Sequence, residues 1–114
     1  MIDSHVHLGS LGRTASPRTT LTPQQWVDRM DREGIELGVL LPLESPEVGG
    51  YFMTEEAIAA RDLFPERLIA FLCLDPRMPG MAAQFDAFVE RYGCRGFGEH
   101  LNGLPFADPL NKVI

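Results

Sequence analysis

The chain has 114 residues, of which 45% are hydrophobic and 23% charged, and its formal net charge is -6. This size and composition are typical of one globular domain with a core of its own. The acidic balance argues against a nucleic-acid partner, and no apolar run approaches the roughly 20 residues that span a bilayer.

The N-terminus and the two cysteines indicate the cellular compartment. The first residues contain no basic leader and no cleavable apolar segment, so we expect a cytoplasmic protein without a membrane partner. Cys73 and Cys94 stand far apart and lack Cys-x-x-Cys spacing. We expect reduced, buried thiols inside strands, with a disulfide as the less favoured alternative.

In chain order, the first predicted element is a strand over 2–8. Asp3, His5 and His7 occupy every second position, so they share one face of the strand and the residues between them share the other. Two neighbouring imidazoles at a strand end form a pair of ligands for zinc or another divalent metal, and the Asp3 carboxylate could orient them. Two exposed histidines on an edge strand are the alternative.

A polar loop over 9–21 is predicted to lead into the first helix. Thr22 is a suitable N-cap, Pro23 suits the first helical position, and Gln25 completes the spacing of a capping box. Gly34 ends this helix. Its apolar face consists of Trp26, Val27 and Met30.

The following elements continue the alternation of strands and helices. They are a buried strand over 37–41 stopped by Pro42, a helix capped by Thr54 that ends before Pro65, a strand over 68–74, a helix with an apolar stripe of Met81, Phe85, Phe88, Val89 and Tyr92, and a strand over 94–100. Asp108 could cap one further helix.

This order predicts βαβ units and a parallel sheet that is buried on both faces. No Gly-x-Gly-x-x-Gly loop follows the first strand, and the His-x-His strand favours a barrel over an open sheet. A (β/α)8 barrel takes about 250 residues. We therefore predict an α/β fold, the N-terminal half of a TIM barrel with about four parallel strands and three helices. Residues 1–114 would form part of one domain cut within its fourth βα unit, and a natural half-barrel that pairs with a second copy is the alternative.

The opening run Ile-Asp-Ser-His-Val-His-Leu-Gly resembles the first strand of the amidohydrolase superfamily, and the chain as a whole resembles its amidohydrolase-related branch. The resemblance implies a metal-dependent hydrolase, or a decarboxylase of the same branch, with a small-molecule substrate. It implies that His5 and His7 bind the catalytic divalent metal, zinc first among the candidates. Such a metal polarises the substrate carbonyl and lowers the pKa of water to about 7.

Glu99 and His100 end the predicted strand over 94–100, where the active sites of barrels lie. Neighbouring residues of a strand face opposite sides, so at most one of the two faces the barrel interior. In the family this strand often supplies a carboxylated lysine or a glutamate, and Lys112, the single lysine, lies past it. The resemblance thus implies a mononuclear site or one with Glu99 as a ligand, and leaves Glu99 and His100 as catalytic candidates. A surface glutamate and a core histidine are the alternatives.

The family's further histidine ligand and its late aspartate base have no counterpart in these 114 residues. Two histidines alone would hold a metal weakly, because zinc sites use at least three protein ligands. We therefore expect the complete protein to be an enzyme and this segment alone to be inactive.

Two loops at the ends of predicted strands carry further candidate residues. Arg13 and Arg18 could meet a substrate carboxylate, although loop arginines are more often solvated, and Asp75 is interpreted as an Asp-Pro turn.

A metal-dependent phosphoesterase or nuclease of a related barrel is one alternative function. A metal-free half-barrel that acts as an assembly module is the other. A homo-oligomer is kept as an open alternative.

Overall fold

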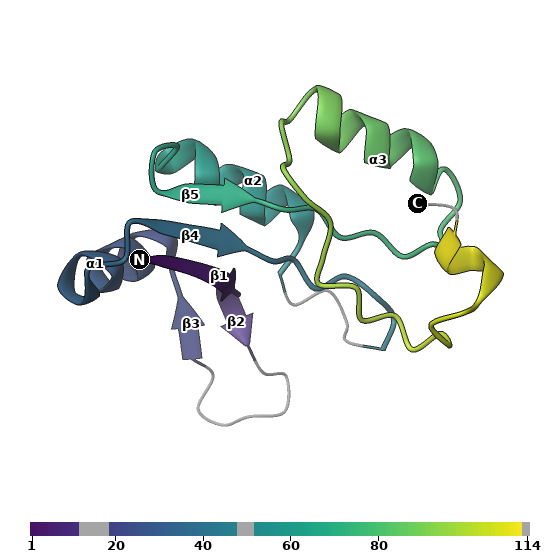
Figure 1. Ribbon diagram of the computed structural model, residues 1–114, viewed down its shortest axis with the longest axis horizontal. Helices are drawn as coiled ribbons and strands as arrows, with labels where there is room; N and C mark the ends of the chain where they lie inside the picture. The colour runs from purple at the N-terminus through teal and green to yellow at the C-terminus, as the bar shows by residue number, and fades with distance from the viewer. Residues whose placement is uncertain (12–18, 48–51, 113–114) are drawn as a thin grey trace.

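The computed structural model describes residues 1–11, 19–47 and 52–112. Parallel strands alternate with helices along the chain (Figure 1). In order, the elements are β1 (Ile2–Val6), β2 (Gly9–Leu11), β3 (Thr19–Leu21), α1 (Pro23–Glu33), β4 (Leu37–Leu40), α2 (Thr54–Leu63), β5 (Leu68–Ala70), α3 (Met81–Glu90) and the 3-10 helix η1 (Pro109–Lys112).

Three of the strands form one parallel sheet in the order β1-β4-β5. Figure 1 shows them side by side with their arrows pointing the same way. Ile2 pairs with Leu37 at the start of β4, and Gly38 pairs with Leu68 at the start of β5. Parallel neighbours require crossover connections, and α1 and α2 provide them. The predicted α/β alternation is confirmed.

The strand predicted over 94–100 is wrong in its extent. This segment runs parallel to the chain that follows β5, but it forms a single bridge, between Leu72 and Phe97. The Leu72 N–H donates to the Gly96 carbonyl, and the Leu72 carbonyl accepts from the Gly98 N–H, both at 2.8 Å. Glycine weakens strands, which accounts for the short pairing. The parallel sheet of the described residues therefore has three strands rather than about four.

The third strand is shorter than predicted, because β5 ends at Ala70. The Thr54 hydroxyl accepts from the Cys73 N–H and donates to the Cys73 carbonyl, both at 3.0 Å. A side chain thus takes the place of a neighbouring strand. Thr54 is 0% exposed and is the first residue of α2. The predicted N-cap at Thr54 is wrong, since Met53 holds that position and donates its N–H to the Glu56 carboxylate at 2.7 Å.

Helix α1 begins and ends as predicted. The Gln25 N–H donates to the Thr22 hydroxyl at 3.2 Å, and the Thr22 N–H donates to the Gln25 side-chain oxygen at 2.9 Å, which completes the capping box. Gly34 ends the helix in the left-handed region with φ 69°, a conformation that favours glycine. The three predicted core residues of this helix are buried.

The apolar stripe predicted along α3 is only partly buried. Met81 and Phe88 are buried, and Phe85 packs against the core. Val89 and Tyr92, however, are 41% and 47% exposed. Since α3 ends at Glu90, Tyr92 lies beyond the last helical turn, where the helical period no longer determines its direction.

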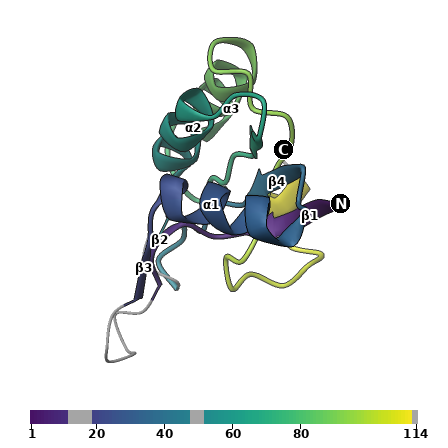
Figure 2. The ribbon, with the colours of Figure 1, turned by 90° about the vertical axis from the view of Figure 1, so that its left-hand side faces the viewer.

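The polar loop predicted over 9–21 contains a short antiparallel pair, which that prediction missed. Gly9 of β2 pairs with Leu21 of β3, and the pair extends away from the rest of the molecule in both ribbon views (Figures 1 and 2). Thr19 and Thr20 are β-branched, which favours a strand over a loop.

One hydrophobic core joins the sheet to the three helices. It consists of Val6, Leu8, Trp26, Val27, Met30, Ile35, Leu40, Phe52, Ala57, Ile58, Ala60, Leu68, Ala70, Leu72, Leu74, Met81, Phe88 and Cys94.

Both cysteines are free and buried, as predicted, but they follow β5 and α3 instead of lying inside strands. Burial raises the pKa of the Cys94 thiol, and it raises that of Cys73 to about 11. Among the described residues, none of the helices combines the length and hydrophobicity that crossing a bilayer requires.

Candidate metal centre

The first strand brings His5 and His7 together. Val6, which lies between them, is buried in the core, whereas the side chains of His5 and His7 are 55% and 17% exposed. The pairing of β1 with β4 is irregular between Asp3 and Val6. The Asp3 carboxylate accepts from the backbone N–H of His5 at 3.1 Å, so it supports the strand end rather than an imidazole.

The carbonyl of Leu41 sets the tautomer of His7. It lies 2.7 Å from His7 Nδ1, and a carbonyl oxygen only accepts, so Nδ1 carries the proton. In the neutral imidazole, Nε2 then holds the free lone pair. Metal-binding histidines typically have such an acceptor behind the ring.

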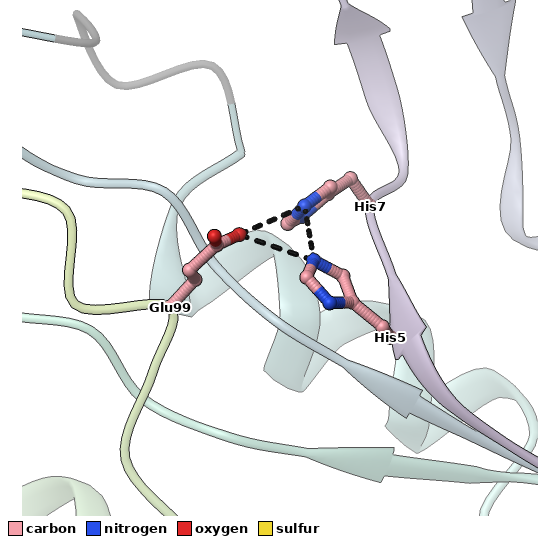
Figure 3. A group of neighbouring side chains, drawn as sticks. All are labelled: His5, His7 and Glu99. Carbon is pink, nitrogen blue, oxygen red and sulfur yellow. Dashed lines mark hydrogen bonds and ion pairs between the residues drawn. The ribbon is translucent and has the colours of Figure 1, made fainter.

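Glu99 reaches the same place from the segment beside β5. Its backbone N–H donates to the Pro42 carbonyl at 2.9 Å, so the consecutive carbonyls of Leu41 and Pro42 hold His7 and Glu99. In Figure 3 the three side chains point toward one another. Glu99 Oε2 lies 3.1 Å from His5 Nε2 and 3.2 Å from His7 Nε2. The two Nε2 atoms are 3.0 Å apart.

These three facing atoms have too few protons to satisfy one another. With the His7 proton on Nδ1, a neutral His5 supplies one N–H at most, and the Glu99 carboxylate supplies none. The contact between His7 Nε2 and Glu99 Oε2 therefore brings two lone pairs to 3.2 Å. A proton or a metal ion between the atoms would remove this repulsion.

The spacing of the three atoms fits a small divalent cation. With bonds of about 2.0–2.1 Å, tetrahedral zinc separates its ligand atoms by about 3.3 Å, and octahedral coordination separates adjacent ones by about 2.9 Å. The observed separations of 3.0, 3.1 and 3.2 Å lie between these values. Two imidazoles and a carboxylate are also a donor set of catalytic zinc sites. His5, His7 and Glu99 are the residues that would hold the ion.

His100 turns to other partners. Its Nε2 lies 2.9 Å from Asn111 Oδ1 and 3.0 Å from Asn102 Nδ2, and its ring lies 5.2 Å from that of Phe97. Glu99 and His100 thus contact different neighbours, although neither lies in a strand. These contacts tie His100 to the segment over 101–112 rather than to the candidate metal ligands.

Sequence reasoning missed an ionic cluster that joins the loops after β4 and β5. The Arg77 guanidinium donates two hydrogen bonds of 2.8 Å to the Glu47 carboxylate and also binds Asp75. These bonds lower the pKa of Glu47 to about 2 and hold the pKa of Asp75 below its ordinary value. Asp75 also accepts from the Arg77 N–H at 2.8 Å, which confirms the turn interpretation. No spacing rule links positions 47 and 77, so the sequence carried no signal of this pairing.

No protein-family model and no curated protein matches this chain. Solved structures with a similar fold include the following two. One is a probable 2-pyrone-4,6-dicarboxylic acid hydrolase from Acinetobacter baumannii with citric acid bound, with a TM-score of 0.63 and 20% identity over 98% of this chain and 43% of that one. The other is 4-oxalomesaconate hydratase from Rhodopseudomonas palustris, with a TM-score of 0.59 and 16% identity over 96% of this chain and 46% of that one.

The chain has the fold of half a (β/α)8 barrel. It spans less than half the length of either similar structure. In such barrels the active site lies at the carboxyl ends of the strands. The candidate metal centre lies at these ends, because His7 follows β1 and Leu41 follows β4. Arg13 and Arg18, the candidates for a substrate carboxylate, lie outside the described residues.

Proposed function

We propose that the protein is a metal-dependent hydrolase of the amidohydrolase-related type, in which His5, His7 and Glu99 hold a divalent metal, zinc first among the candidates. The observation that carries this proposal is the set of three ligand atoms 3.0–3.2 Å apart at the carboxyl ends of parallel strands. The resemblance of the opening strand and the fold likeness to a hydrolase and a hydratase support it.

Each of the three ligands has a separate role in this proposal. The Leu41 carbonyl keeps the His7 proton on Nδ1, so that Nε2 faces the ion. Glu99 adds the negative charge that two neutral imidazoles lack. His5 would supply the second imidazole, and it has the most exposed side chain of the three. The bound metal would polarise a substrate carbonyl and lower the pKa of water.

We propose a small substrate that carries carboxylates. The two similar structures are named for enzymes of 2-pyrone-4,6-dicarboxylic acid and 4-oxalomesaconate, and the first holds citric acid. Both hydrolysis of an ester-type or amide-type bond and decarboxylation suit such a substrate. The activity is proposed for a whole barrel domain of which residues 1–114 form part, and these residues alone are expected to be inactive.

Zinc titration of the metal-free protein tests the proposal. We expect one zinc ion per chain, and a rise in the zinc Kd of more than about 100-fold in His5→Ala, His7→Ala and Glu99→Gln, beyond the loss of an outer partner. His100→Ala is the matched control and should bind zinc like the wild type. A protein that binds no zinc and is indifferent to His5→Ala would instead support a metal-free assembly module. Turnover of a phosphodiester dye in preference to esters and amides would favour the related phosphoesterases.

A further inference from the structure

Cys73 contacts the main chain of Glu99. Its Sγ lies 3.2 Å from the Glu99 carbonyl oxygen and 3.9 Å from that of Glu44, so the S–H group donates to Glu99. The N–H of Glu99 is already bound by the Pro42 carbonyl. Both main-chain polar groups of Glu99 therefore have fixed partners.

The thiol is itself held in place. The hydroxyl of Thr54 binds both the N–H and the carbonyl of Cys73, and Thr54 is fully buried at the start of α2. Cys73 is 2% exposed and Cys94 is 5% exposed, and of the two only Cys94 packs within the main cluster of core side chains. Burial alone therefore does not distinguish the two cysteines, but their contacts do.

We infer that Cys73 is a positioning residue for Glu99. The Glu99 carbonyl accepts a hydrogen bond from the Cys73 thiol, while the Glu99 carboxylate faces His5 and His7. This inference rests on the proposed metal centre for its functional meaning. The Leu101 N–H also donates to the Glu99 carbonyl, at 3.1 Å, so the thiol is a second donor to this oxygen and ties it to the chain that follows β5. Since S–H donors are weak, the expected effect is a modest change in the placement of Glu99 rather than a loss of the fold.

Hydrogen exchange of the Glu99 amide tests the contact without any metal. In Cys73→Ala we expect the amide to exchange about two- to fivefold faster by NMR, which is the size of a weak hydrogen bond. Cys73→Ser keeps a donor and should restore slow exchange. Cys94→Ala removes the same atom from another buried site and should leave Glu99 unchanged. Equal exchange rates in Cys73→Ala and Cys94→Ala would overturn the inference.

Zinc affinity then tests the consequence for the metal centre. We expect the zinc Kd to rise about three- to tenfold in Cys73→Ala, at or below the lower end of the roughly 10- to 100-fold cost of losing an outer partner, and to stay unchanged in Cys94→Ala. A zinc Kd unchanged in Cys73→Ala would overturn the positioning role. If the wild type binds no zinc but Glu99 exchange responds as expected, the contact stands and the proposed function fails.

A measurement on the wild type covers the case in which Cys73→Ala does not fold. Because coupling between two sites is reciprocal, zinc should slow the reaction of Cys73 with N-ethylmaleimide more than that of Cys94. Equal slowing of both thiols would contradict the inference, since it would reflect only a general gain in stability.

Discussion

Thr54 offers a sharp test of how the chain is held together next to the candidate metal centre. Its hydroxyl is the side-chain partner of both the N–H and the carbonyl of Cys73, and both residues are buried. Thr54→Val keeps the shape of the side chain and removes both bonds. A buried polar group left without a partner costs about 1–3 kcal/mol. We therefore expect the free energy of unfolding to fall by about 2–6 kcal/mol for the two groups.

Two further substitutions separate this role from that of a helix N-cap. Thr54→Ser keeps the hydroxyl and loses one methyl group, so it should cost only about 1 kcal/mol. Thr54→Asp would be tolerated at an N-cap, where Asp is among the preferred residues. In this structure it places a carboxylate at a position with 0% exposure, which is strongly unfavourable. Thr54→Asp should therefore be less stable than Thr54→Val.

Urea unfolding, followed by the fluorescence of the single tryptophan, Trp26, measures these differences. Trp26 is buried in the core, so its emission reports global unfolding. The reasoning is refuted if Thr54→Val and Thr54→Ser are equally stable, or if Thr54→Asp is as stable as the wild type. The first result would mean that the bonds to Cys73 contribute nothing net, and the second that Thr54 acts as an N-cap after all.

Two further predictions concern stability. Hydrogen bonds from Arg77 lower the pKa of Glu47 to about 2 and the pKa of Asp75 below its ordinary value. Depressed carboxylate pKa values stabilise the fold above the unfolded values and lose that contribution as the pH falls toward the folded ones. Stability should therefore drop between about pH 4.5 and pH 2, and Arg77→Gln should flatten this part of a melting-temperature profile. In addition, a Cβ at Gly96 would overlap the ring of Phe71, so Gly96→Ala should lower the free energy of unfolding in urea by about 1–3 kcal/mol. In the double variant, Phe71→Ala removes the overlapping ring and should restore part of that loss. Strictly additive costs of the two substitutions would contradict the overlap.

The parts of the fold that depend on local pattern were predictable. The capping box and the left-handed Gly34 define α1 without reference to the rest of the chain. The alternation in β1 likewise placed His5 and His7 together, because the side-chain period of a strand is a local property. Pro42 has no N–H, so the end of β4 was visible as well.

The parts that depend on pairing between distant segments were not predictable. Thr54 followed by two glutamates reads as a helix cap, and only its burial against Cys73 shows the different role. The choice of Glu99 over His100 as the residue beside the histidines depends on the register of its segment, which the Pro42 carbonyl sets. Backbone acceptors such as Leu41 and Pro42 have no side-chain signature that a sequence could reveal.

The candidate metal centre joins residues that are far apart along the chain. His5 and Glu99 are separated by 94 positions, and the helices α1, α2 and α3 and the strands β4 and β5 lie between them. In an unfolded chain, bringing two such distant points together carries a large loop-closure entropy, so the three ligand atoms come together only when the intervening units are folded. An ion bound there would link these distant segments, and it would stabilise the folded state by an amount that rises with the logarithm of its concentration above the Kd. Metal occupancy would then report the integrity of the fold as a whole.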